Sequence, residues 1–207
     1  HGLFDPEMLR WGGWGGRFDT LKTLNIYGNQ LKWAEPDLHD SESEFQPYYM
    51  YAHASDSWID PETEIKYEGF GVPIYRWRRA YQNDFEARMD WCIQPFQNAN
   101  HNPVAAIGDN SSDEVIFVSA KPGTILKLNT SKSSDPDGDE ISFNWYIYSE
   151  AGTYKKPVQI KNSKEAEMQL TIPADNSGKQ IHIILEVTDL NKLVKLTDYR
   201  RIVVNIN

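Results

Sequence analysis

The sequence predicts an α+β protein with two unlike parts: an N-terminal part made of loops and one helix, and a C-terminal antiparallel β-sandwich. Six of the seven tryptophans lie within residues 1–100. One long stretch with helical spacing ends at Pro95, and short segments with strand character begin near residue 115. A polar, breaker-rich segment separates the two patterns, so we place the parts at 1–97 and 104–207 with a linker at 98–103.

Residues 11–17 read Trp-Gly-Gly-Trp-Gly-Gly-Arg, a composition that suits neither a regular helix nor a strand. We therefore expect a loop that presents flat indole faces. Such faces stack on sugar rings or nucleobases, and an arginine can hold hydroxyl groups, so Trp11, Trp14 and Arg17 are candidate ligand-binding residues. The alternative is that both indoles pack against a hydrophobic core.

Two acidic segments, residues 34–48 and 60–71, are rich in turn-forming residues and are predicted to be loops. The dipeptide His39-Asp40 lies in the first of them. This dipeptide and the tetrapeptide at 53–56, His-Ala-Ser-Asp, both offer a histidine beside a carboxylate. The alternative interpretation for both motifs is a solvated loop.

The next segment carries large side chains at every fourth position: Trp77, Tyr81, Phe85 and Met89. This period predicts a helix over residues 74–94 with the stripe facing a core and Pro95 ending the helix. Arg78 and Asp84 are candidates for the edge of a ligand pocket. Ion pairing with neighbouring side chains is the alternative role for both.

The remainder of the chain contains short segments of β-branched, aromatic and aliphatic residues separated by turns. The expected strands are 115–119, 124–129, 141–148, 157–161, 166–172, 180–188 and 194–206. Strands of this length and spacing are typical of a β-sandwich, and Trp145 is placed like the core tryptophan of immunoglobulin-like folds. The sequence therefore predicts an immunoglobulin-like antiparallel β-sandwich in which Trp145 has a packing role.

One turn, Asp-Pro-Asp-Gly-Asp at 135–139, brings three carboxylates within five residues. Calcium prefers several such oxygen ligands, so Asp135, Asp137 and Asp139 are candidates for a structural calcium site. The alternative is a tight turn in which the aspartates accept hydrogen bonds from nearby backbone amides.

The composition excludes several classes of function and structure. The net charge of −9 disfavours binding to nucleic-acid polymers but is compatible with neutral ligands such as sugars. The single cysteine, Cys92, excludes an intrachain disulfide and is expected to be a buried helix thiol. No run of residues has the length and apolarity of a membrane-spanning helix.

Several segments, in this order, resemble the cellulose-binding, nucleoside hydrolase-like family of bacteria that degrade polysaccharides. They are WGGWGGRF at 11–18, RWR at 76–78, QNDF at 82–85, RMDW at 88–91, NHNP at 100–103, SDPDGD at 134–139, EAGTY at 150–154 and IHIILEVTD at 181–189. The resemblance implies the C-terminal end of an α/β nucleoside hydrolase-like domain followed by the immunoglobulin-like domain. It also implies an exported protein, secreted, periplasmic or on the cell surface.

Enzymes of the hydrolase family bind calcium through an Asp-x-Asp-x-x-x-Asp-Asp cluster, which is absent from residues 1–100. We therefore expect a metal site, where there is one, in an upstream hydrolase-like portion, and no catalysis by this chain alone. The predicted function is an accessory or glycan-binding part whose ligand is a β-glucan or a nucleoside-like glycoside. The alternatives are part of a glycosidase that hydrolyses an N-glycosidic or related bond, and a purely structural cap.

Overall fold

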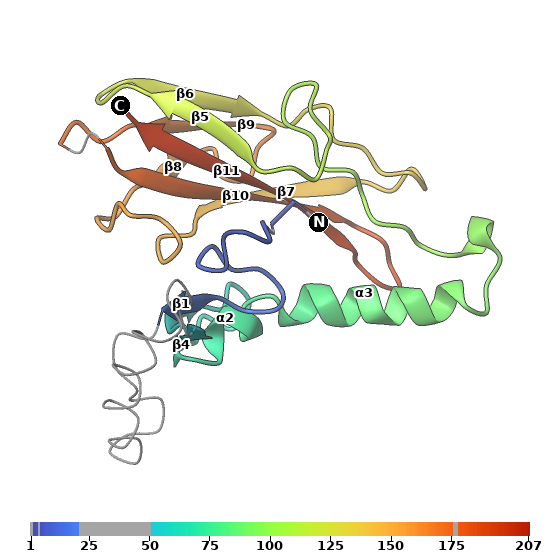
Figure 1. The fold of residues 1–207 in the computed structure, drawn as a ribbon. Coiled ribbons are helices and arrows are strands. Elements are labelled where there is room, and N and C mark those ends of the chain that lie inside the picture. Colours follow the sequence, from blue (N-terminus) through green and yellow to red (C-terminus); the bar gives the residue numbers. More distant parts are fainter. Residues whose placement is uncertain (1, 4, 21–50, 176–177) are drawn as a thin grey trace, which may run out of the picture.

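The computed structural model describes residues 2–3, 5–20, 51–175 and 178–207 (Figure 1). The C-terminal half consists of strands joined by turns. These strands are β5 (Ile116–Ala120), β6 (Ile125–Asn129), β7 (Ile141–Ile147), β8 (Ile160–Lys161), β9 (Glu167–Thr171), β10 (Gln180–Asp189) and β11 (Thr197–Ile206). Each overlaps one of the predicted segments, so the predicted series of strands is confirmed.

The strands form two open sheets, one of order β5-β11-β10-β7 and one of order β6-β9-β8. All neighbouring strands are antiparallel except β5, which runs parallel to β11. Apolar side chains from both sheets meet in one cluster, and Figure 1 shows the two sheets as stacked layers. The predicted β-sandwich is therefore present.

The sandwich core is formed by the alternate side chains of each strand that point between the two sheets. Met168 and Leu170 of β9 face Ile183 and Leu185 of β10, and all four side chains are fully buried. Trp145 of β7 lies in the same cluster, and its indole Nε1 donates to the Glu165 carbonyl at 2.9 Å. Burial of each of these large apolar side chains stabilises the fold by about 1.5–3 kcal/mol. Trp145 has the packing role that the sequence predicts for it.

The outer face of the four-stranded sheet is buried as well. A second apolar cluster joins this face to the N-terminal part and contains Leu3, Trp77, Tyr148, Ile184 and Tyr199. Because both faces are covered, β10 is buried along nearly its whole length rather than at alternate positions only. The N-terminal part is thus docked on the sandwich.

That part is small and irregular. Its elements are β1 (Phe18–Thr20) paired with β2 (Tyr51–His53), β3 (Asp56–Ile59) paired with β4 (Lys66–Gly69), α2 (Val72–Tyr75), α3 (Arg78–Trp91) and the 3-10 turn η2 (Phe96–Asn98). Residues 11–17 form a loop, as predicted. The prediction of a loop over 60–71 is wrong at its end, because residues 66–69 pair with β3 as a hairpin.

The helix predicted over 74–94 is present as two helices, α2 and α3, and the predicted stripe is buried only at its N-terminal end, where Trp77 and Tyr81 pack in the second cluster. Trp77 is buried, whereas Phe85 and Met89 are 66% and 53% exposed. The helix instead turns Ala87 toward Val194 and Leu196 in the loop between β10 and β11. A small side chain lets the helix backbone approach this loop closely, so the contact is made beside the aromatic stripe rather than through it. Cys92, expected to be buried, is exposed.

Candidate functional site

A wide groove lies between the N-terminal part and the outer face of the four-stranded sheet, with a volume of about 1170 Å³. We call it the interlayer groove. Its principal lining residues are Trp58, Tyr67, Arg76, Arg78, Tyr146 and Glu186. They come from the β3–β4 hairpin, from α2 and α3, and from strands β7 and β10, so the groove exists only because the two parts are docked.

One wall of the interlayer groove is aromatic. Trp58 and Tyr67 are directly opposite each other in the β3–β4 hairpin. Their rings are stacked, with centroids 6.0 Å apart and planes inclined by 26°. Tyr67 is 39% exposed, and Tyr75 of α2 is 54% exposed beside it. Flat rings of this kind, half in solvent, are suited to stacking on a planar or sugar-like ligand.

The opposite wall is polar and belongs to the sheet. Glu186 accepts hydrogen bonds from Asn144 Nδ2 at 2.7 Å and from Tyr146 Oη at 3.3 Å. Burial raises the pKa of Glu186, against the lowering effect of Asn144, and burial also raises the pKa of Tyr146 well above its usual value. The wall therefore holds hydrogen-bonding groups at fixed positions, as the recognition of hydroxyl groups requires.

Arg76 closes the groove between the two walls. Its guanidinium lies 4.1 Å from the centroid of the Tyr148 ring, and Nη1 lies 3.4 Å from Asp56 Oδ2 and 3.9 Å from Glu150 Oε2. Burial lowers the pKa of Arg76, but the surrounding Tyr146, Tyr148, Glu150 and Asp56 outweigh it and raise that pKa overall. Arg76 thus remains a positive charge held by anionic and aromatic neighbours.

Asp56 is the centre of the network behind Arg76. It accepts from Arg17 Nε at 2.8 Å and from Tyr148 Oη at 2.6 Å. Arg17 also donates from Nη2 to the Ser55 carbonyl at 2.9 Å, and it is only 8% exposed. The structure therefore places the predicted ligand residue Arg17 in a buried ion pair. A ligand-binding role for it stays a prediction.

Residues 11–17, which we call the Trp-Gly loop, are held against the sandwich by Arg201. This buried guanidinium donates to the carbonyls of Leu3, Trp11 and Gly12 at 2.8–2.9 Å. Gly12 has φ +76°, and an added Cβ would lie 2.8 Å from Tyr148 Oη, so glycine is required by both conformation and space.

The two indoles of this loop both face the protein. Trp11 is 6% exposed, with its ring centroid 5.0 Å from that of His182. Trp14 is half-buried and contacts Tyr81 and Tyr199 edge-on at 6.4 and 6.3 Å. Both rings thus have packing partners on the described part of the chain, and stacking on a ligand stays a prediction for both.

Of the two helix residues predicted to line a pocket, only Arg78 lines the interlayer groove. Asp84 lies elsewhere on α3, buried, with Oδ2 2.5 Å from Arg88 Nε. This is the ion-pairing alternative that the sequence left open for Asp84.

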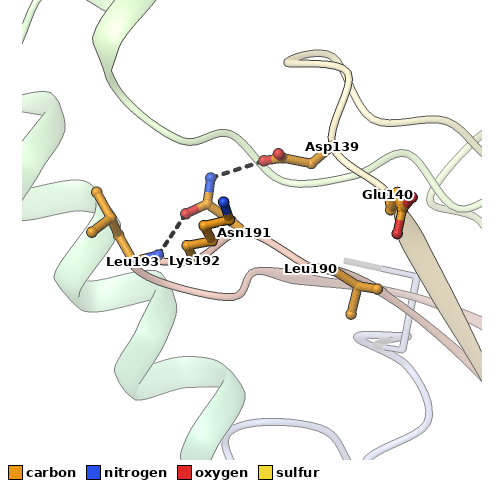
Figure 2. Close-up of a pocket in the computed structure, with 6 residues that line it drawn as sticks. All are labelled: Asp139, Glu140, Leu190, Asn191, Lys192 and Leu193. Atoms are coloured by element: carbon orange, nitrogen blue, oxygen red, sulfur yellow. Dashed lines mark hydrogen bonds between the residues drawn. The ribbon is translucent and has the colours of Figure 1, made fainter.

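The aspartates of the 135–139 turn are engaged in hydrogen bonds. Asp135 Oδ1 accepts from the backbone amides of Asp137 and Asp139 at 2.8 and 3.1 Å. Asp137 lies 3.0 Å from His101 Nδ1, and Asp139 accepts from Asn191 Nδ2 at 2.8 Å, at the rim of a small pocket of about 380 Å³ (Figure 2).

In the described ranges, no three histidine, cysteine, aspartate or glutamate side chains are grouped so as to hold a metal ion. Calcium binding by Asp135, Asp137 and Asp139 remains a prediction, and the hydrogen-bonded turn is the arrangement seen.

The histidine–carboxylate motif at residues 53–56 does not converge on the groove. His53 is exposed and its ring lies 4.8 Å from that of Phe18, while Asp56 belongs to the buried network. His39-Asp40 and the acidic segment 34–48 lie outside the described residues. Among the helices that the structure describes, none is long and apolar enough to cross a membrane.

Sequence reasoning missed the sheet side of the groove. Asn144, Tyr146 and Glu186 are outward-facing positions of β7 and β10, and the strand register brings Asn144 opposite Glu186. The available signal was an asparagine and a glutamate that each have an apolar residue on either side, in Phe143-Asn144-Trp145 and Leu185-Glu186-Val187. Period-two alternation assigns these residues to one face, but it gives no indication that another layer covers that face.

Residues 125–206 match the family model described as the C-terminal domain of cellulose-binding protein Sde0182. The full chain aligns, at 34% identity and a TM-score of 0.75, with a solved structure described as a nucleoside hydrolase-related hypothetical protein from Saccharophagus degradans that is associated with carbohydrate metabolism. The chain spans 44% of that protein.

Two further solved structures are of titin. A chimeric titin Z1Z2 is 20% identical over 53% of this chain and 99% of its own, with a TM-score of 0.28. Titin domain M7 is 10% identical over 54% of this chain and 99% of its own, with a TM-score of 0.27. At such scores neither likeness supports a structural argument. No curated protein matches the chain.

Proposed function

Because residues 125–206 match the C-terminal domain of a cellulose-binding protein family, as the sequence motifs predicted, we propose that the chain is a glycan-binding accessory part of an exported, nucleoside hydrolase-related protein. In this proposal it binds carbohydrate and catalyses nothing by itself. Residues 1–97 are the end of the hydrolase-like domain, 98–103 the linker and 104–207 an immunoglobulin-like sandwich.

The strand topology supports the immunoglobulin-like assignment. Such sandwiches pair a sheet containing the second, fourth and fifth strands with a sheet containing the third, sixth and seventh. The chain has β6, β8 and β9 in one sheet and β7, β10 and β11 in the other, with β5 added beside β11. Trp145 on β7 is buried at the place where these folds have their core tryptophan.

The observation that carries the proposal is the interlayer groove, where an aromatic wall faces a polar one. Trp58 and Tyr67 offer flat faces, and Asn144, Tyr146 and Glu186 offer donors and acceptors on the opposite side. A β-glucan has this same division, since its equatorial hydroxyls leave two apolar C–H faces on each ring. We therefore favour a β-glucan over a nucleoside-like glycoside.

Calorimetric titration with soluble β-glucan oligosaccharides and with nucleosides tests this proposal. We expect Trp58→Ala to weaken binding of the β-glucan by about tenfold or more, as loss of a central aromatic contact does. Phe70→Ala is the matched control, because Phe70 is 53% exposed in the same segment and does not line the groove. Equal affinity of the Trp58→Ala variant and the unchanged chain would refute this site.

A second candidate function is a contribution to glycosidic bond hydrolysis, favoured by Glu186. A buried carboxyl group with a raised pKa is suited to act as a general acid, and Glu150 provides a second carboxylate in the same groove. Release of base or reducing sugar by the full-length protein, lost in Glu186→Gln, is the expected result. A full-length protein inactive on all nucleosides and β-glucans would exclude this candidate.

A further inference from the structure

The side of α3 that faces away from the sandwich carries a row of large apolar side chains. Phe85, Met89, Ile93 and Phe96 are 66%, 53%, 79% and 69% exposed. Phe85 and Met89 are four residues apart on one side of α3, and Ile93 and Phe96 follow in the turns after its last residue, Trp91. We call this row the α3 stripe. Four large apolar side chains exposed this close together in the chain mark a contact surface.

The α3 stripe is held on a firmly docked support. Ala87 packs against Val194 and Leu196, and Asn83 Nδ2 donates to the Lys195 carbonyl at 2.8 Å. Figure 1 shows α3 lying along the sandwich with the β10–β11 loop reaching it. The exposure of the stripe is therefore not the result of a detached helix.

The end of the stripe is fixed by its own contacts. Trp91 Nε1 donates to the Asn100 carbonyl at 2.7 Å, and the Phe96 ring lies 4.0 Å from that of His101. His101 in turn lies 3.0 Å from Asp137 of the sandwich. The stripe thus has a defined shape before any partner arrives, which lowers the entropic cost of binding.

The length of the relative from Saccharophagus degradans bears on the partner of the stripe. The whole of this chain aligns with 44% of that protein, so more than half of the relative lies outside the aligned part. From this we propose that the α3 stripe is the docking surface for the remaining, hydrolase-like portion of the same protein. The proposal is independent of glycan binding in the interlayer groove, because the stripe residues do not line that groove.

A second copy of the chain fits the stripe less well. Four such side chains, partly exposed, offer about 400 Å² per copy, whereas a stable interface needs roughly 800 Å² from each partner. The net charge of −9 adds repulsion between two copies. A portion tethered on the same chain needs less area, because the covalent link raises its effective concentration.

The single cysteine allows a direct test. Cys92 is exposed and lies between Met89 and Ile93 of the stripe in sequence, and no other cysteine exists in the 207 residues. Iodoacetamide labelling followed by peptide mass spectrometry gives the reaction rate of this thiol. We expect Cys92 to react at least about tenfold more slowly in the protein expressed from its complete reading frame than in the 207-residue chain.

Substitutions distinguish coverage of Cys92 by a docked partner from other causes of slow labelling. In the complete protein, Phe85→Asp with Met89→Asp should restore fast labelling, while Phe117→Asp on the sandwich, 58% exposed in the unchanged chain, should leave the rate slow. Equal Cys92 rates in the short and complete proteins overturn the proposal, as does a reading frame that encodes nothing beyond this chain. A Cys92 labelling rate of the short chain that falls as the protein concentration is raised, together with a dimer mass by light scattering, overturns the proposal in favour of a second copy.

Discussion

The four-stranded sheet has two buried faces that are built from different chemistry. The inner face, with Ile183 and Leu185, meets the second sheet through apolar side chains. The outer face mixes Ile184 and Tyr199 with His182, Glu186 and Arg201, all covered by the N-terminal part. One strand, β10, supplies both faces by alternation.

The inner face mainly contributes stability, whereas the outer face determines how the N-terminal part is positioned. An apolar interface tolerates many side chains of suitable volume. The outer face instead joins buried charges, which are costly unless each finds its partner. Arg201 donates to two carbonyls of the Trp-Gly loop and to that of Leu3, and Asp56 joins Arg17, Arg76 and Tyr148. This polar network fixes how the N-terminal part sits, and the groove is formed between the two.

The largest expected effect is on the outer face, from Asp56→Asn. The substitution keeps the shape but leaves Arg17 and Arg76, both nearly buried, without their shared counter-charge. We expect the free energy of unfolding to fall by about 3–5 kcal/mol, measured by urea denaturation. Asp109→Asn is the matched control, since that side chain is 87% exposed, and it should change stability by less than about 0.5 kcal/mol. A loss below about 1 kcal/mol for Asp56→Asn would mean that this network contributes little.

Two neighbouring residues compare the packing of the faces directly. Ile183 lies on the inner face and Ile184 on the outer face, and both are fully buried. We expect Ile183→Ala and Ile184→Ala each to lower the free energy of unfolding by about 2–5 kcal/mol, through lost burial and the cavity left behind. Each variant is the control for the other in the same assay. A much smaller loss for Ile184→Ala would show that the outer face is packed loosely.

How much the sequence predicts also differs between the faces. The strands, the sandwich and the position of Trp145 follow from alternation and turn residues, which are local signals. The outer face depends on contacts between residues far apart in the sequence, such as Tyr148 with Asp56 and Arg201 with Trp11. Nothing in the spacing of these residues indicates their pairing, so the interlayer groove was not predicted.

The helix gives the same lesson within one element. Helical period correctly predicts α3, but the predicted stripe is buried only at Trp77 and Tyr81, and its second half, Phe85 and Met89, is exposed. A stripe shows that a helix face is suited to burial and leaves open which surface buries it. Ala87, with its small side chain, gave no apolar signal and yet makes the contact with the sandwich.

A smaller loss of stability is expected when the pH is lowered, and it arises from His182 on the outer face. Burial, together with Arg201, lowers the pKa of His182 to about 3, against 6.5 for an ordinary histidine. Between about pH 3 and pH 6.5 the unfolded chain binds a proton at His182 that the folded chain does not. The stability that the neutral His182 contributes is therefore fully present above about pH 6.5 and is lost as the pH falls toward 3. We expect His182 to account for about 2 kcal/mol of lost stability by pH 5.

His182→Asn isolates this contribution, because its Oδ1 can accept from Arg201 as the ring Nδ1 does. Urea denaturation at pH 7 and pH 5 should show a shallower loss in the variant than in the unchanged chain. Glu186, whose raised pKa acts in the opposite direction above pH 4.5, is the same in both proteins and cancels in the comparison. Identical pH dependence in the two proteins would mean that folding does not lower the pKa of His182.

The smallest effect is expected for Phe85→Ala in the α3 stripe, and Ala87→Leu on the buried side of α3 is its comparison. Ala87 is 1% exposed against the β10–β11 loop, so the larger side chain should overpack this contact and lower the free energy of unfolding by about 1–3 kcal/mol. Phe85 is 66% exposed, and alanine is a good helix former, so Phe85→Ala should change stability of the 207-residue chain by no more than about 0.5 kcal/mol. Thermal unfolding followed by circular dichroism measures both. A Phe85→Ala loss comparable to that of Ala87→Leu would mean that the stripe already packs within this chain, whereas a loss that appears only in the complete protein places its partner there.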